Sequence, residues 1–299
     1  MHKLIEAGSY VGRFAPSPSG DLHFGSLIAA VASFLQARSQ SGKWLIRIED
    51  IDPPREIEGS ANRILLDLKR FGMEADEPVL YQSSQLKQYL IALYSLFDSG
   101  YAFNCSCSRK SLPASGIYPG NCRYQRPVES GALSVRLKTG TDIVSFSDRL
   151  LGEISEDLSR TCGDFVIWRT DKLPAYQLAV VVADAIQGVT EVVRGADLLD
   201  SSCRQIYLQR LLNFPTPAYV HLPVATVNGS KLGKRLSSDP IANQDPVLAL
   251  SSALEFLGHR PPPDHDLGSL WEWAIEHWSI QNIPARRSIP VDDVSGFQS

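Results

Sequence analysis

A histidine near the start of the chain and a lysine-rich segment far downstream carry side chains that can bind phosphate. His23 follows a Pro/Gly-rich turn and precedes apolar residues at helical spacing, which predicts a helix N-terminus there. Such a terminus presents free N–H groups and the positive end of the helix dipole. Lys231 and Lys234 follow the tight turn expected at 228–229. These groups could stabilise a transferring phosphoryl group, although each alone also fits an ordinary helix corner or a solvated basic turn.

Two arginines and one glutamate stand at the ends of predicted strands. Arg13 follows the short apolar run at 10–11, and Glu49 and Arg194 each end an apolar strand. Open α/β sheets bind their ligands outside the carboxyl ends of the strands. A guanidinium pairs bidentately with a carboxylate, whereas an ammonium needs an anion. The three side chains therefore suit an acidic amino acid, and the alternative for each alone is a structural ion pair.

Three of the five cysteines cluster in one polar segment. Cys105, Cys107 and Cys122 are typical of a site for a soft metal, most often zinc, which requires a fourth ligand. No histidine is close in sequence, so Tyr118 is the local candidate. The alternative is three free thiols. An odd number of cysteines, three of them clustered, favours a reduced protein with one structural zinc over a disulfide scaffold.

Helices alternate with strands on both sides of the cysteine segment, which predicts an α/β fold with a doubly wound parallel sheet. The elements expected after the first turn are a strand at 44–49, helices at 57–71 and 86–97, short strands at 133–137 and 164–168, an apolar run at 178–182, a strand at 189–194, a helix at 206–212, a strand at 218–227 and helices at 245–257 and 267–278.

The order of these elements predicts three parts. Residues 1–100 and 174–240 form a split catalytic domain, 101–173 form an insertion with the metal site, and 241–299 form a helical C-terminal segment.

The composition indicates a globular protein with a substantial core, since 43% of the 299 residues are hydrophobic. A formal net charge of −4 argues against nonspecific nucleic-acid binding over the whole surface, but it leaves room for a local basic face. No apolar run is long enough to span a membrane, and no signal peptide is evident at the start. We therefore expect a cytoplasmic monomer that does not associate with membranes.

Two segments resemble the signatures of class I aminoacyl-tRNA synthetases. The run at 12–26 resembles the HIGH motif in its glutamyl form, and 231–235 resembles the KMSKS loop. Ser26 stands where the family has its final histidine, and Gly233 stands where it usually has serine. The resemblance implies that ATP binds with Mg²⁺ and that His23 and Lys234 are catalytic. The ATP-binding residues that it implies are His23, Gly25, Lys231 and Lys234.

The same resemblance assigns residues to L-glutamate and to the metal. The segment 174–176 resembles the one whose tyrosine touches the amino acid. The glutamate-binding residues implied are Arg13, Phe14, Ala15, Pro16, Ser17, Glu49, Tyr176 and Arg194. The zinc ligands implied are Cys105, Cys107, Tyr118 and Cys122.

The length of the chain bears on the acceptor of glutamate. Conventional glutamyl enzymes continue into a helical domain that reads the anticodon, and this sequence stops at Ser299. It thus resembles truncated relatives that activate glutamate without tRNA and attach it to the queuosine base at the wobble position of tRNA(Asp). The alternatives are a short conventional enzyme charging the 3′ end of tRNA(Glu) and an inactive zinc-bearing RNA-binding module. Arg47, Arg55 and Arg235 around the cleft are expected to meet RNA phosphates.

Overall fold

The computed structural model of the protein describes residues 10–124, 132–227, 230–231 and 240–291. The predicted doubly wound parallel sheet is confirmed. β2 (Lys43–Ile48) pairs in parallel with β1 (Val11–Phe14) and with β3 (Leu80–Tyr81). In the second half of the chain, β10 (Ala218–Leu222) pairs in parallel with β9 (Glu191–Gly195).

β1 and β9 lie side by side and join these two groups of strands. The Thr190 N–H donates to the Val11 carbonyl at 2.9 Å, and the Val11 N–H donates to Thr190 Oγ1 at 2.9 Å. The spatial order is therefore β3-β2-β1-β9-β10. Successive strands are added on one side of β1 in the first half of the chain and on its other side in the second half, so the strand order reverses at β1. This is the doubly wound arrangement, and its ligand crevice lies at the carboxyl ends of the two strands on either side of that reversal.

The predicted helices are present between the strands. α1 (Phe24–Ser39) is buried on most sides, with Leu27, Val31 and Leu35 fully inaccessible, because it packs between β1 and the C-terminal helices. The apolar run at 178–182 is helical and lies within α5 (Tyr176–Gln187). The connecting helices are α1 (Phe24–Ser39), α2 (Ser60–Arg70), α3 (Leu86–Asp98), α5 (Tyr176–Gln187) and α6 (Leu199–Leu211).

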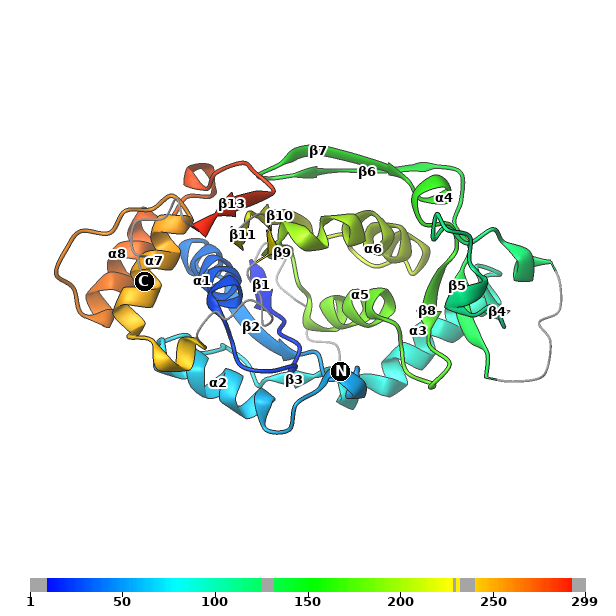
Figure 1. Ribbon diagram of the computed structural model, residues 1–299, viewed down its shortest axis with the longest axis horizontal. Coiled ribbons are helices and arrows are strands. Elements are labelled where there is room, and N and C mark those ends of the chain that lie inside the picture. Colours follow the sequence, from blue (N-terminus) through cyan, green and yellow to red (C-terminus); the bar gives the residue numbers. More distant parts are fainter. Residues whose placement is uncertain (1–9, 125–131, 228–229, 232–239, 292–299) are drawn as a thin grey trace.

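The segment with the cysteines forms its own antiparallel sheet at one end of the molecule (Figure 1). In this sheet β5 (Ser134–Leu137) lies between β4 (Ala102–Cys105) and β8 (Phe165–Trp168), which confirms the short strands predicted at 133–137 and 164–168. The short helix α4 (Leu158–Thr161) precedes β8.

A long hairpin in the same stretch was missed by sequence reasoning. β6 (Ile143–Asp148) and β7 (Gly152–Asp157) pair with each other, and Asp148 of β6 also pairs with Tyr219 of β10. Figure 1 shows the hairpin running along the top of the molecule from α4 towards β10. The main sheet therefore contains a strand that comes from within residues 101–173.

The C-terminal segment packs on α1 at the other end of the molecule (Figure 1). The helices predicted at 245–257 and 267–278 are present as α7 (Pro246–Phe256) and α8 (Leu267–His277), and Asp245 caps α7 by accepting from two backbone N–H groups. Trp278 donates to Gln36 of α1 at 2.8 Å. The remaining strands are β11 (Val224–Val227), β12 (Ser230–Lys231) and β13 (Ser288–Pro290). Within the described residues, no helix has the length and apolar character needed to cross a bilayer.

Candidate active site

A cleft of about 330 Å³ opens at the carboxyl ends of β1 and β9. One wall is formed by the turn after β1 and the first residues of α1, and the other by Gly195, Asp197 and the segment 222–225. A cleft of this volume can hold a small molecule. Of the predicted site residues, it brings together Phe14, Pro16, Ser17, His23 and Gly25.

His23 is the N-cap residue of α1. Its Nδ1 accepts a hydrogen bond from the Ser26 N–H at 3.3 Å. A neutral imidazole then carries its proton on Nε2, which makes this nitrogen a donor. The cleft therefore combines a helix N-terminus with an imidazole donor, an arrangement that suits an anionic group. Ser26, the departure from the HIGH pattern, also lines the cleft.

The lysine-rich segment begins beside the cleft. The backbone of Lys231 belongs to β12 and pairs with Thr226 of β11, and Val224 and Ala225 at the start of β11 line the cleft. The side chain of Lys231 and the whole of 232–235, including Lys234, lie outside the described residues. Their predicted roles stay predictions.

Arg13 is oriented by a buried carboxylate. It is 4% exposed, and its Nε donates to Asp184 Oδ1 at 3.2 Å. Arg47 donates to the same oxygen at 2.6 Å. Burial alone would raise the pKa of Asp184, but Arg47 and Arg13 hold that pKa below its usual range. Within the described part of the chain the two Nη groups of Arg13 make no hydrogen bond, so they can meet a ligand.

The prediction that Arg47 meets RNA phosphates is wrong. Its side chain is fully buried and is bound to Asp184, Glu49 and Gln187, since it lies on β2 inside the sheet. It acts instead as a counter-ion within the protein. Arg55 is exposed and paired with Asp52, which leaves its predicted RNA contact a prediction. Arg235 lies outside the described residues.

Glu49 directly follows β2 and is 8% exposed. Its Oε1 accepts from Arg47 at 3.3 Å and from Gln82 at 3.4 Å. Its N–H donates to the Pro16 carbonyl at 3.0 Å, which fixes the segment containing Ala15 against this strand end. Burial raises the pKa of Glu49 despite the neighbouring arginines. Its second carboxylate oxygen makes no hydrogen bond among the described residues and is placed to accept one from a cation.

Arg194 lies on β9, one strand away from Arg13, and is 4% exposed. Its three nitrogens donate to His221 Nε2 at 3.2 Å, to Gln205 Oε1 at 2.8 Å and to Ser202 Oγ at 2.9 Å. In the described part of the chain it forms no ion pair with a carboxylate. A buried guanidinium of this kind provides an unneutralised positive charge.

Tyr176 is the first residue of α5. It keeps 38% of its surface accessible. Burial raises the pKa of its hydroxyl, and Glu49 raises it further, against the effect of Arg194 and Arg13. Glu49, Arg194 and Arg13 thus each lie within electrostatic range of the Tyr176 hydroxyl.

Two acidic residues of the site were not predicted. Asp184 orients Arg13. The sequence signal that could have indicated its role is an isolated carboxylate within the apolar stretch 176–187. Asp197 lines the cleft opposite His23. Its carboxylate lies directly against the α-carbon of Gly195, where a Cβ would collide with it, so position 195 favours glycine.

The three predicted cysteine ligands are brought together. The Sγ atoms of Cys105, Cys107 and Cys122 lie within 4.8 Å of one another and could hold a metal ion. The Tyr118 hydroxyl lies 3.5 Å from the first of these sulfurs and 3.9 Å from the second, and it accepts from the Cys122 N–H at 2.8 Å. Burial would raise the pKa of Cys122, but hydrogen bonds from Tyr118 and the Ser106 backbone lower it to about 7.

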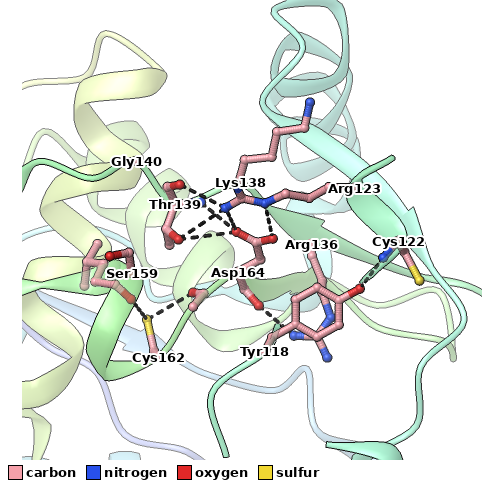
Figure 2. Close-up of polar contacts among 12 residues, drawn as sticks. Tyr118, Cys122, Arg123, Arg136, Lys138, Thr139, Gly140, Ser159, Cys162 and Asp164 are labelled. Atoms are coloured by element: carbon pink, nitrogen blue, oxygen red, sulfur yellow. Dashed lines mark hydrogen bonds and ion pairs between the residues drawn. The ribbon is translucent and has the colours of Figure 1, made fainter. Parts of the chain in front are cut away.

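Arg136 of β5 supports this cluster, and the sequence analysis did not identify this residue. Its Nε donates to Cys105 Sγ at 3.2 Å, and its guanidinium lies 4.0 Å from the centre of the Tyr118 ring. Figure 2 shows it beside Tyr118, near Asp164, whose carboxylate binds Arg123. A buried cation here would offset the charge of thiolates and a phenolate.

The comparisons with known proteins show which family this chain belongs to. Residues 10–115 and 123–267 match the catalytic domain of class I tRNA synthetases (E and Q). The chain is 48% identical to a glutamyl-Q tRNA(Asp) synthetase of Serratia proteamaculans (strain 568), covering 97% of both chains. It is 49% identical to another from Aromatoleum aromaticum, covering 93% of this chain and 91% of the relative.

Solved structures of low identity share the fold. A glutamate–tRNA synthetase from Elizabethkingia anophelis superposes with a TM-score of 0.78 at 22% identity, over 94% of this chain and 68% of the other. A glutamate tRNA ligase from Elizabethkingia meningosepticum CCUG26117 gives 0.79 at 21%, over 95% and 67%. The family match and the relatives aligned over nearly their whole length show that this chain belongs to the glutamyl-Q tRNA(Asp) synthetases. These are ligases within the class I tRNA synthetases of the glutamate and glutamine type.

Proposed function

We propose that this protein activates L-glutamate with ATP, without tRNA, and then transfers the glutamyl group to queuosine at the wobble position of tRNA(Asp). The observation that carries the proposal is the set of buried charges at the strand ends. Arg13 and Arg194 offer two guanidinium groups, and Glu49 offers a carboxylate. Free L-glutamate presents the complementary set of two carboxylates and one ammonium.

In the activation step, a carboxylate oxygen of glutamate attacks the α-phosphorus of ATP, and pyrophosphate leaves. His23 donates from Nε2 to the phosphate oxygens, and the N-terminus of α1 adds its free N–H groups. Lys231 and Lys234 contribute further positive charge. Bound together with ATP, Mg²⁺ would supply positive charge that offsets the phosphate charge. The protein supplies positioning and charge rather than a covalent intermediate.

In the transfer step, a hydroxyl of the queuosine cyclopentenediol attacks the acyl carbon of glutamyl-adenylate. An ester forms and AMP leaves. The vicinal hydroxyls of the cyclopentenediol resemble those of a terminal ribose, so they could occupy the place that ribose takes in a conventional synthetase. An unstacked anticodon base is also accessible to a protein pocket.

Glutamate-dependent ATP–pyrophosphate exchange in the absence of tRNA tests the activation step. We expect exchange with L-glutamate and little with L-glutamine, because an amide leaves a buried guanidinium unpaired. No exchange with any amino acid would contradict the proposal and favour an inactive RNA-binding module.

The pH dependence of glutamate binding tests the role of Glu49. Its ionised form attracts the substrate ammonium, and burial raises its pKa. We therefore expect the KM for glutamate to be constant between the pKa of Glu49 and that of the substrate ammonium, and to rise as the pH falls through the pKa of Glu49. The carboxylates of free glutamate titrate lower, near about 4 or below. Glu49→Gln should have a raised KM that no longer varies over the same range; a pH dependence unchanged by this substitution would contradict the assignment.

The cysteine cluster fits a structural zinc ion. Zn–S bonds of about 2.3 Å in a tetrahedral site separate two sulfurs by roughly 3.7 Å, and Cys107 Sγ and Cys122 Sγ lie 3.6 Å apart. Cys105 and the Tyr118 hydroxyl complete four protein ligands. With four protein ligands no position stays open for a catalytic water, so the ion would stabilise the insertion rather than act in the reaction.

Metal analysis should find one zinc per chain in the native protein. Cys122→Ser should lose it, and the strands β4, β5 and β8 should then become more susceptible to proteolysis while the parallel sheet persists. Cys162→Ser is the matched control, because the Cys162 thiol donates to the Leu158 and Gly163 carbonyls and lies outside the cluster. A native protein without metal, or a Cys122→Ser variant that retains it, would overturn the zinc assignment.

A further inference from the structure

The hydrogen-bond partners of Arg194 are all uncharged, although an aspartate lies just beyond them. His221, Ser202 and Gln205 are each at most 1% exposed and receive its three donors. We propose that Asp148 and His221 form a relay of positioning residues for Arg194: they fix its orientation while leaving its charge unpaired for the substrate carboxylate. This inference rests on the proposed activation of glutamate.

The hydrogen bonds of His221 determine which ring nitrogen carries the proton. Its Nδ1 lies 2.6 Å from Asp148 Oδ2, and an ionised carboxylate can only accept, so the proton is on Nδ1. Nε2 is then an acceptor, and it faces two donors, Arg194 Nε at 3.2 Å and Ser202 Oγ at 2.9 Å. Burial lowers the pKa of His221, and Arg194 opposes the effect of Asp148, so the ring is neutral at neutral pH.

Asp148 is itself held rigidly. It is 2% exposed, and it ends β6, the strand of the hairpin that sequence reasoning missed. Its Oδ1 accepts from the Leu150 and Leu151 N–H groups at 3.0 and 2.8 Å, and its Oδ2 accepts from the His221 N–H at 3.2 Å. Burial would raise its pKa, but His221 and these backbone donors hold that pKa below its usual value. Asp148 therefore stays ionised and fixes the tautomer of His221.

The relay explains how a buried arginine can be both ordered and available. A carboxylate bound directly to Arg194 would neutralise it, as Asp184 partly does for Arg13. The neutral imidazole places the negative charge of Asp148 on the far side of a ring. A substrate carboxylate is then the nearest counter-ion, whereas a carboxamide would leave the charge unpaired. The relay thus contributes to the choice of glutamate over glutamine.

Exchange kinetics of His221→Leu and Asp148→Asn test the relay. His221→Leu removes the acceptor for Arg194. Asp148→Asn can place an N–H against Nδ1 and so favour the tautomer with the proton on Nε2. For both we expect the KM for glutamate to rise by about 10- to 100-fold, by analogy with the scale found for outer-shell partners of metal ligands. The KM for ATP should stay unchanged, and discrimination against glutamine should weaken.

Three controls separate positioning from folding. His221→Gln keeps an acceptor oxygen and should recover part of the glutamate affinity. Ser202→Ala removes one hydroxyl from the same group without a large cavity and should raise the KM for glutamate. In an Arg194→Ala background, His221→Leu should add no further loss, because its effect passes through Arg194.

The outcomes distinguish the relay from the function on which it rests. An unchanged KM for glutamate in folded His221→Leu and Ser202→Ala variants would overturn the relay and leave the proposed function standing. Additive losses in the double variant would also overturn the relay. Native protein that shows no glutamate-dependent exchange would overturn the proposed function and the relay with it.

Discussion

Replacing Lys234 or His23 with alanine is expected to lower the rate of glutamate-dependent ATP–pyrophosphate exchange by about two to three orders of magnitude. This is the usual effect of removing one preorganised donor to a transition state. His23 lies in the cleft at the N-terminus of α1, and Lys234 lies in the segment that resembles the KMSKS loop. Because both would act on charge that develops in the transition state, the KM for glutamate should change much less than kcat.

His23→Asn separates catalysis from helix capping. His23 caps α1 through Nδ1, and asparagine is a favourable N-cap residue, so this variant should keep the stability that His23→Ala loses. It lacks the Nε2–H donor, however, and exchange should remain low. Near-normal exchange in Lys234→Ala would refute the catalytic assignment of the lysine-rich segment. Full activity in His23→Asn would show that His23 caps α1 but does not act in catalysis.

Replacing Arg13 or Arg194 with alanine should weaken glutamate activation strongly while ATP binding persists. Removing one partner of a buried charge pair costs about 3–5 kcal/mol, which is about two to three and a half orders of magnitude in kcat/KM. Arg13→Ala also leaves Asp184 with Arg47 as its counter-ion, so the fold should survive. The readout is kcat/KM for glutamate at saturating ATP, together with the thermal stability of each variant.

Arg55→Ala is the matched control for these two variants. Arg55 is an exposed arginine outside the glutamate pocket, and its loss should leave tRNA-independent exchange unchanged. Native protein that accepts glutamine as readily as glutamate would contradict the assignment of the two buried arginines.

Local sequence patterns predicted the parts of the site that lie within one strand–turn–helix unit. The N-cap position of His23 and the strand end at Glu49 both depend on residues a few positions away. The cysteine cluster was also predictable, because metal ligands require particular residue types, and few residues offer them.

Contacts between distant segments were beyond such reasoning. The residues around Arg47 in the sequence do not distinguish it from other arginines near strand ends. It is an internal counter-ion because Asp184, which lies on α5, packs against it. The joining of β6 to β10, and with it the contact of Asp148 with His221, depends on a strand pairing between residues far apart in sequence. The alternation of polar residues at 143–157 does not predict the sheet with which these strands pair.

Transfer of labelled glutamate to tRNA(Asp) tests the central claim most directly. Two preparations of the same tRNA are compared, one with queuosine and one with guanosine at the wobble position. We predict that only the queuosine form accepts glutamate, and that periodate cleavage of the queuosine diol abolishes acceptance. Transfer to both forms alike, or charging of the 3′ adenosine of tRNA(Glu) instead, would contradict this account and identify a conventional glutamyl-tRNA synthetase.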